Sequence, residues 1–148
     1  MKKFLLLLLG VLLLSGCSKK IEKFSLDDEY YEKAEIIEIN NEELLSLEVL
    51  EKNFAVFVHI DGCTSCADFK EVLREFSEKY NITFYSTSAL SVDDKCIKGC
   101  VKYSPSVVIF KGGDVVDYLD AVSNEDLPYY ETVDGFKNWF TKYVQLKD

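Results

Sequence analysis

The residues of this sequence best suited to chemistry are two pairs of cysteines. Cys63 and Cys66 have C-x-x-C spacing, and Cys96 and Cys100 have C-x3-C spacing. A cysteine thiolate attacks disulfides, and a second thiol within reach releases the product of that attack. A lone C-x-x-C also occurs in zinc sites, so the elements around the pair must distinguish disulfide exchange from zinc binding.

The first pair lies between a predicted buried strand and a predicted amphipathic helix. Residues 54–60 form an apolar run of strand length, and the helix that follows has apolar residues at spacings of three and four. At the first turn of that helix, free backbone N–H groups and the helix dipole stabilise a thiolate at Cys63. Three residues along the helix, the Cys66 thiol comes back beside it. We therefore predict Cys63 as the nucleophile and Cys66 as the resolving thiol.

The rest of the folded part alternates between strands and helices. We predict strands at 35–39, 82–85, 106–110 and 115–119, helices at 41–53, 92–103 and 136–146, and an irregular insertion at 122–133. This order predicts an α/β fold, in which a central mixed sheet of four to five strands has helices on both faces.

The N-terminus looks like a targeting signal. Lys2 and Lys3 precede the apolar run 4–14, which is too short to cross a bilayer. Its end, Leu-Ser-Gly-Cys at 14–17, resembles the lipobox of bacterial lipoproteins, which implies cleavage before Cys17 and a diacylglycerol on its sulfur. An ordinary signal peptide, or a cytosolic chain with an apolar start, is the alternative.

These features predict three regions. Residues 1–16 are a lipoprotein signal peptide, 17–33 a charged, lipidated tether, and 34–148 the folded domain. We expect the protein on the extracytoplasmic face of the cell membrane, where disulfides persist.

From about residue 35 to 146 the sequence resembles the thioredoxin-like superfamily. The resemblance rests on residues 54–81, with their C-x-x-C, and on 103–116, where Ser104-Pro105 precedes a strand and a Lys-Gly-Gly turn. A small lipoprotein with this spacing is also similar to bacteriocin-accessory-type thioredoxin-like proteins. The resemblance implies a cis bond before Pro105 and a Ser104 backbone that pairs with an extended substrate.

The function implied by this resemblance is thiol–disulfide exchange. The expected partners are extracytoplasmic protein thiols and disulfides, together with a redox partner protein, and no bound cofactor is expected. Three departures leave the redox potential and the direction of electron flow open. Gly62 stands where the family has Trp, Thr64-Ser65 replaces Gly-Pro, and Phe57 replaces a buried acid.

His59 and Asp61 are candidate modulators of the cysteine pair. His59 either packs as a ring, accepts a proton in place of the missing acid, or binds copper or zinc. Asp61 is predicted as a turn residue; close to the Cys63 sulfur it would raise the thiol pKa.

Cys96 and Cys100 are not part of the family's pattern. Residues at i and i+4 of a helix are too far apart for a disulfide unless the helix breaks, and Gly99 offers a place for that break. We predict a second, structural or regulatory disulfide. The alternatives are a relay dithiol serving Cys63 and Cys66, or metal binding by all four cysteines or by Cys96, Cys100 and His59.

The charge excludes nucleic acid as a partner. The formal net charge is −9, and removing residues 1–16, with two Lys and no acids, makes it −11, whereas nucleic-acid binding depends on Lys and Arg. Two rivals to the oxidoreductase remain: a metal-handling protein for copper or zinc, and a non-catalytic partner-binding module of an envelope complex.

Overall fold

The computed structural model describes residues 22–147. The predicted signal peptide 1–16 and the predicted lipidation site Cys17 lie outside the described residues. Within 22–147, no helix has both the length and the apolar character that a membrane span needs.

A five-stranded mixed sheet forms the centre of the fold. Its strands are β1 (Ile36–Glu38), β2 (Phe54–His59), β3 (Phe84–Ser88), β4 (Ser106–Lys111) and β5 (Asp114–Tyr118), in the order β1-β3-β2-β4-β5. β3 runs parallel to both β1 and β2, whereas β4 is antiparallel to β2 and β5 is antiparallel to β4.

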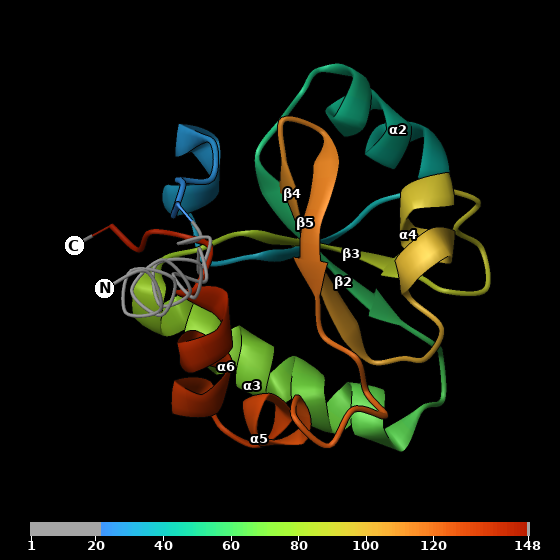
Figure 1. The fold of residues 1–148 in the computed structure, drawn as a ribbon, viewed down its shortest axis with the longest axis vertical. Coiled ribbons are helices and arrows are strands. Elements are labelled where there is room, and N and C mark those ends of the chain that lie inside the picture. Colours follow the sequence, from blue (N-terminus) through green and yellow to red (C-terminus); the bar gives the residue numbers. More distant parts are fainter. Residues whose placement is uncertain (1–21, 148) are drawn as a thin grey trace, which may run out of the picture.

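Helices cover both faces of this sheet (Figure 1). On one face lie α2 (Asn41–Val49) and α4 (Lys95–Cys100), and on the other lie α3 (Thr64–Tyr80), α5 (Leu127–Glu131) and α6 (Val133–Phe140). The predicted α/β fold with a mixed sheet and helices on both faces is confirmed.

The central strands are apolar on both sides because both of their faces are covered. Every residue from Phe54 to Val58 in β2, and from Val107 to Phe110 in β4, is at most 1% exposed. A continuous apolar run, rather than an alternating one, is typical of such strands. β2 is therefore a rigid support for the loop that follows it.

An aromatic cluster holds α3 against α6 and the sheet. The Phe76 ring lies 4.8 Å from Phe136 and 5.4 Å from Phe140, and Phe69 lies 5.7 Å from Phe136. These edge-to-face contacts come from the apolar stripe of α3. They fix the helix whose first turn carries the cysteine pair.

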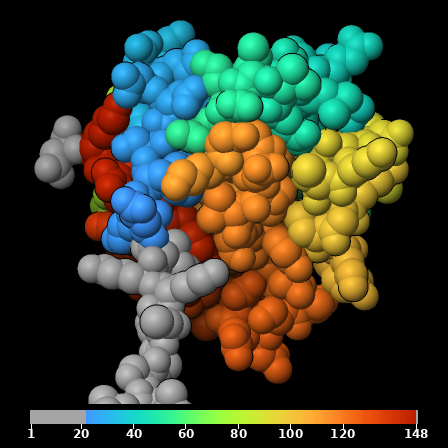
Figure 2. Space-filling view, turned by 45° about the horizontal axis from the view of Figure 1, so that its top comes forward, coloured from blue at the N-terminus to red at the C-terminus, as the bar shows by residue number. Residues whose placement is uncertain are grey.

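The prediction that residues 17–33 are a tether is wrong for the part from Phe24 to Tyr31. Phe24, Leu26, Tyr30 and Tyr31 are at most 9% exposed, and Asp28–Tyr31 form a short 3₁₀ helix. The Phe24 N–H donates to the Tyr143 carbonyl at 2.9 Å. Figure 2 shows this blue segment against the orange β4–β5 hairpin. The segment packs through separate large side chains, so its sequence has no periodicity from which its burial could be predicted.

The predicted irregular insertion at 122–133 instead contains α5, and the last helix starts earlier and ends earlier than the predicted 136–146. α5 and α6 meet at Gly135, where a Cβ would lie 2.3 Å from the Pro128 carbonyl oxygen. Glycine is therefore required for this close approach, which fixes α5 beside the N-terminal half of α3.

Candidate redox site

Cys63 and Cys66 form a disulfide at the start of α3, with their Cα atoms 5.2 Å apart. The chain leaves β2 through a turn at Asp61-Gly62, where Gly62 has φ +76°, a left-handed conformation that favours glycine. Cys63 is then the N-cap residue of α3, and its Sγ accepts a hydrogen bond from the Cys66 N–H at 3.1 Å.

The two sulfur-bearing residues differ in exposure. Cys66 is 4% exposed and packs in the core, whereas Cys63 is partly exposed at the surface. A large disulfide substrate can therefore approach Cys63 but not Cys66. Ser65 adds a hydroxyl 3.3 Å from the Cys63 sulfur.

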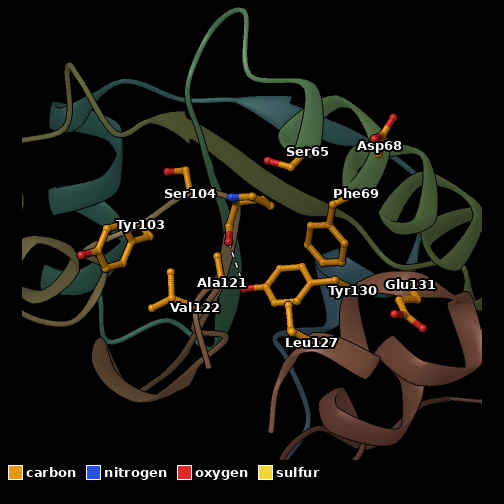
Figure 3. A pocket seen from close by; sticks show the side chains of 11 residues that line it. Ser65, Asp68, Phe69, Tyr103, Ser104, Ala121, Val122, Leu127, Tyr130 and Glu131 are labelled. Carbon is orange, nitrogen blue, oxygen red and sulfur yellow. Dashed lines mark hydrogen bonds between the residues drawn. The ribbon is translucent and has the colours of Figure 1, made fainter. Parts of the chain in front are cut away.

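A pocket of about 410 Å³ opens beside the pair (Figure 3). Its eleven lining residues come from α3, from the segment before β4 and from the region of α5: Ser65, Asp68, Phe69, Tyr103, Ser104, Pro105, Ala121, Val122, Leu127, Tyr130 and Glu131. Ser65 connects the pocket to the Cys63 sulfur. The structure thus brings Ser104 and Pro105 to the same cavity as the C-x-x-C turn, and the bond between them is cis.

Ser104 has polar groups that no described residue satisfies. Its Oγ is buried without a hydrogen-bond partner, and neither its backbone N–H nor its carbonyl is paired within residues 22–147. Buried polar groups in proteins are nearly always paired. An extended segment lying in the pocket would have these backbone groups available.

Tyr130 is a site residue that the sequence did not identify. Its Oη donates a hydrogen bond to the Pro105 carbonyl at 2.9 Å, as the dashed line in Figure 3 shows, and its ring packs 4.7 Å from Phe69. Burial raises the pKa of the Tyr130 hydroxyl, so the group remains a donor at neutral pH. The sequence signal was weak: an aromatic pair inside the insertion, which suggests a loop anchor.

His59 lies between carboxylates rather than on the sulfurs. Its Nε2 is 3.1 Å from the Glu38 carboxylate and its Nδ1 is 3.7 Å from that of Asp61, while its ring stacks on Phe57 at 5.5 Å. None of the described polar contacts of His59 involves Cys63 or Cys66. This geometry favours the packing interpretation of His59, and Asp61 lies in the predicted turn.

The predicted second disulfide between Cys96 and Cys100 is absent from the described structure, where both residues are free thiols. α4 continues through Gly99 without a break, and the Cys100 thiol donates to the Cys96 carbonyl at 3.1 Å. The helical i to i+4 separation therefore keeps the sulfurs apart. Burial raises the pKa of both thiols.

The fold does not bring Cys96, Cys100 and His59 together as the ligands of a metal ion. Among residues 22–147, the metal-ligating groups that lie within 4.8 Å of one another belong to Glu48, Asp94 and Cys96, without His59 or Cys100. Burial, and then the charge and hydrogen bond of Asp94, raise the pKa of Glu48 to about 7. A proton held by Glu48 relieves the repulsion in this cluster.

Comparison with known proteins supports the fold. No family model matches the sequence, and no curated protein matches it. A thioredoxin from Schistosoma mansoni is similar in structure, with a TM-score of 0.56 and 20% identity over 75% of this chain and 97% of its own. Thioredoxin O2 from Arabidopsis thaliana, in its oxidised state, has a TM-score of 0.53 and 17% identity over 74% and 95%.

A third similar structure is a complex of ferredoxin:thioredoxin reductase with thioredoxin f2, with a TM-score of 0.52 and 18% identity over 65% of this chain and 91% of that chain. Together these similarities define the class of the chain. It has a thioredoxin-like α/β fold, with a C-x-x-C-spaced disulfide at the junction of β2 and α3.

Proposed function

We propose that this protein is a thiol–disulfide oxidoreductase in which Cys63 is the attacking thiol and Cys66 the resolving thiol. One observation carries the proposal: a partly exposed Cys63 caps α3 and is disulfide-bonded to a buried Cys66. The helix N-terminus stabilises a thiolate at Cys63. The buried position keeps Cys66 from substrates but not from Cys63.

The exchange proceeds in two steps from the reduced pair. The Cys63 thiolate attacks one sulfur of a substrate disulfide, so that a mixed disulfide forms and the other substrate sulfur leaves as a thiolate that takes up a proton. Cys66, after losing its proton, then attacks the Cys63 sulfur. The second substrate thiol is released, and the enzyme holds the Cys63–Cys66 disulfide.

The cycle needs a partner that returns two electrons to the disulfide or, in the opposite direction, removes them. A redox partner protein with its own dithiol or disulfide would serve, since the sulfurs carry the electrons and no bound cofactor is required. The backbone groups of Ser104, which have no partner within residues 22–147, support the binding of an extended protein segment beside Cys63.

The proposed location is the extracytoplasmic face of the cell membrane, with a lipid on Cys17. The support is the sequence of residues 1–17 alone, with its basic start, apolar run and Leu-Ser-Gly-Cys end. Replacing Cys17 by Ala should then release the protein from the membrane fraction or block its processing. Unchanged membrane retention after normal cleavage would contradict the lipid anchor.

Turnover of a peptide disulfide tests the activity. The reduced full-length protein should convert one disulfide per molecule to two thiols and end with Cys63 joined to Cys66, whereas Cys63→Ser should leave only the background rate. The matched control, Cys96→Ser with Cys100→Ser, should keep the wild-type rate. An unreactive wild-type protein that still binds the peptide would indicate a non-catalytic binding module.

A further inference from the structure

The pocket beside the disulfide has two chemically different ends (Figure 3). One end carries Tyr103 and Val122, which are 56% and 60% exposed, and Leu127 lies beside Tyr130 between the two ends. At the other end are Asp68 from α3 and Glu131 from α5. The eleven lining residues include no lysine or arginine. The cavity therefore joins an apolar surface to an unneutralised acidic edge.

The acidic edge continues along α3. A neighbouring hollow shares Glu131 and is lined also by Glu75, Lys79 and Asp134. Asp68 and Glu75 are seven residues apart on α3, so they lie on the same face of the helix. Lys79 pairs with Asp134 at 3.7 Å.

The remaining carboxylates of this edge lack an ion-pair partner among residues 22–147. Within the part of the chain that the structure describes, none of Asp68, Glu75 and Glu131 takes part in an ion pair, unlike Glu71 and Glu78, which both bind Arg74. Asp68 and Glu131 thus line one end of the pocket, and Glu75 lines the neighbouring hollow that shares Glu131, so three negative charges lie along the α3–α5 edge. A bound cation would relieve their mutual repulsion.

We propose that this edge selects the substrate: a disulfide-bearing protein segment with an apolar side chain beside its cysteine and a lysine or arginine within about four residues. The proposal rests on the proposed function and adds the class of substrate. The apolar side chain fills the Tyr103–Val122 end, the reacting sulfur meets Cys63 next to Ser65, and the cationic side chain lies between Asp68 and Glu131. An extended segment advances about 3.3 Å per residue, so a long basic side chain within a few residues of the cysteine can reach the acidic end of the pocket.

The test compares two disulfide peptides that differ only in whether two lysines or two glutamates flank the apolar residue and the cysteine. With the reduced full-length protein at low salt, the lysine peptide should react about two- to tenfold faster, because each exposed ion pair contributes modestly. Its advantage should shrink in about 0.5 M salt as the charges are screened. Equal rates for the two peptides would overturn the proposal.

Charge-removing variants test whether the acidic edge is the part of the protein that selects the lysine peptide. Asp68→Asn with Glu131→Gln should bring the ratio of the two peptide rates close to one, while circular dichroism verifies the fold. The control, Glu42→Gln with Glu51→Gln, removes the same charge from α2 and its end, on the opposite face of the sheet, and should keep the ratio. Equal loss in both double variants would assign the preference to net charge and contradict a role for the edge.

A small uncharged disulfide separates this proposal from the one on which it rests. A wild-type protein that reduces hydroxyethyl disulfide but treats both peptides alike has the proposed activity without this specificity. A protein that reduces none of the three contradicts the oxidoreductase function itself.

Discussion

The backbone N–H of Cys66 points at the sulfur of Cys63, 3.1 Å away, while the Cys66 side chain is buried beneath it. One turn of α3 thus gives the two cysteines unequal positions. The Cys63 sulfur accepts a hydrogen bond and is accessible, whereas Cys66 donates that bond through its backbone and its own sulfur is buried. This asymmetry underlies the roles proposed for the pair.

Accessibility should order the reactions of the four thiols. After mild reduction, we expect Cys63 to react with iodoacetamide faster than Cys66 by at least about tenfold, because Cys63 is partly exposed and lies at a helix N-terminus. Cys96 and Cys100 should react slowly both before and after reduction, since burial raises the pKa of their thiols. Peptide mapping by mass spectrometry gives each rate, and a Cys96–Cys100 crosslink in freshly purified protein would contradict their free state.

Tyr130→Phe should destabilise the protein by about 0.5–1.5 kcal/mol, because the Pro105 carbonyl loses its hydrogen bond. Tyr129→Phe is the matched control. Its hydroxyl binds only the exposed amine of Lys142 among the described residues, so we expect a change smaller than for Tyr130. Urea unfolding measures both, and equal effects would remove the special role of the Tyr130–Pro105 contact.

Two helical glycines should respond in opposite directions to alanine. Gly135→Ala brings a Cβ against the Pro128 carbonyl and should cost about 1–3 kcal/mol, since α5 must shift. Gly99→Ala in α4 places a Cβ that has no described residue within 4 Å and should stabilise by about 0.5–1 kcal/mol. Thermal unfolding of the two variants tests how tightly α5 is packed on α6, and a neutral Gly135→Ala would contradict that packing.

The free energy of unfolding should decrease as pH rises because Glu48 loses its proton. Its pKa is about 7 in the folded protein against 4.5 as the ordinary value, so the folded state binds the proton more tightly. The stabilisation is complete below about pH 4.5 and is lost as pH rises through about 7. Glu48→Gln should flatten the decline of the unfolding free energy over this range, whereas Glu42→Gln on the same helix should keep it. An unchanged slope in Glu48→Gln would contradict the shifted pKa.

Local patterns in the sequence predicted the parts of the fold that depend on local chemistry. The apolar run of β2, the glycine at 62 and the helical stripe of α3 are each visible within a few residues, so the strand–turn–helix unit around Cys63 could be predicted. The site contacts that were missed join distant segments. Tyr130 is 25 residues from Pro105, and the hydrogen bond between them depends on how α5 packs.

Two wrong predictions have different origins. Residues Phe24 to Tyr31 carry no period because each large side chain fills its own gap in the core, so a charged segment was taken for a tether. For Cys96 and Cys100, the preference for disulfides outside the cytoplasm suggested a bridge. The Asp94 side chain, which accepts from the Ile97 N–H at 2.8 Å, caps α4 and favours a regular helix that keeps the sulfurs apart.

The most direct test of the account is to trap the exchange intermediate. Reduced Cys66→Ser protein, incubated with a peptide disulfide, should accumulate a mixed disulfide that mass spectrometry maps to Cys63, because no resolving thiol is left to release it. Cys63→Ser should form no comparable adduct, and Cys96→Ser with Cys100→Ser should turn over like the wild type. Equal trapping by Cys63→Ser and Cys66→Ser, or an adduct on Cys96 or Cys100, would contradict the assignment of Cys63 as the attacking sulfur.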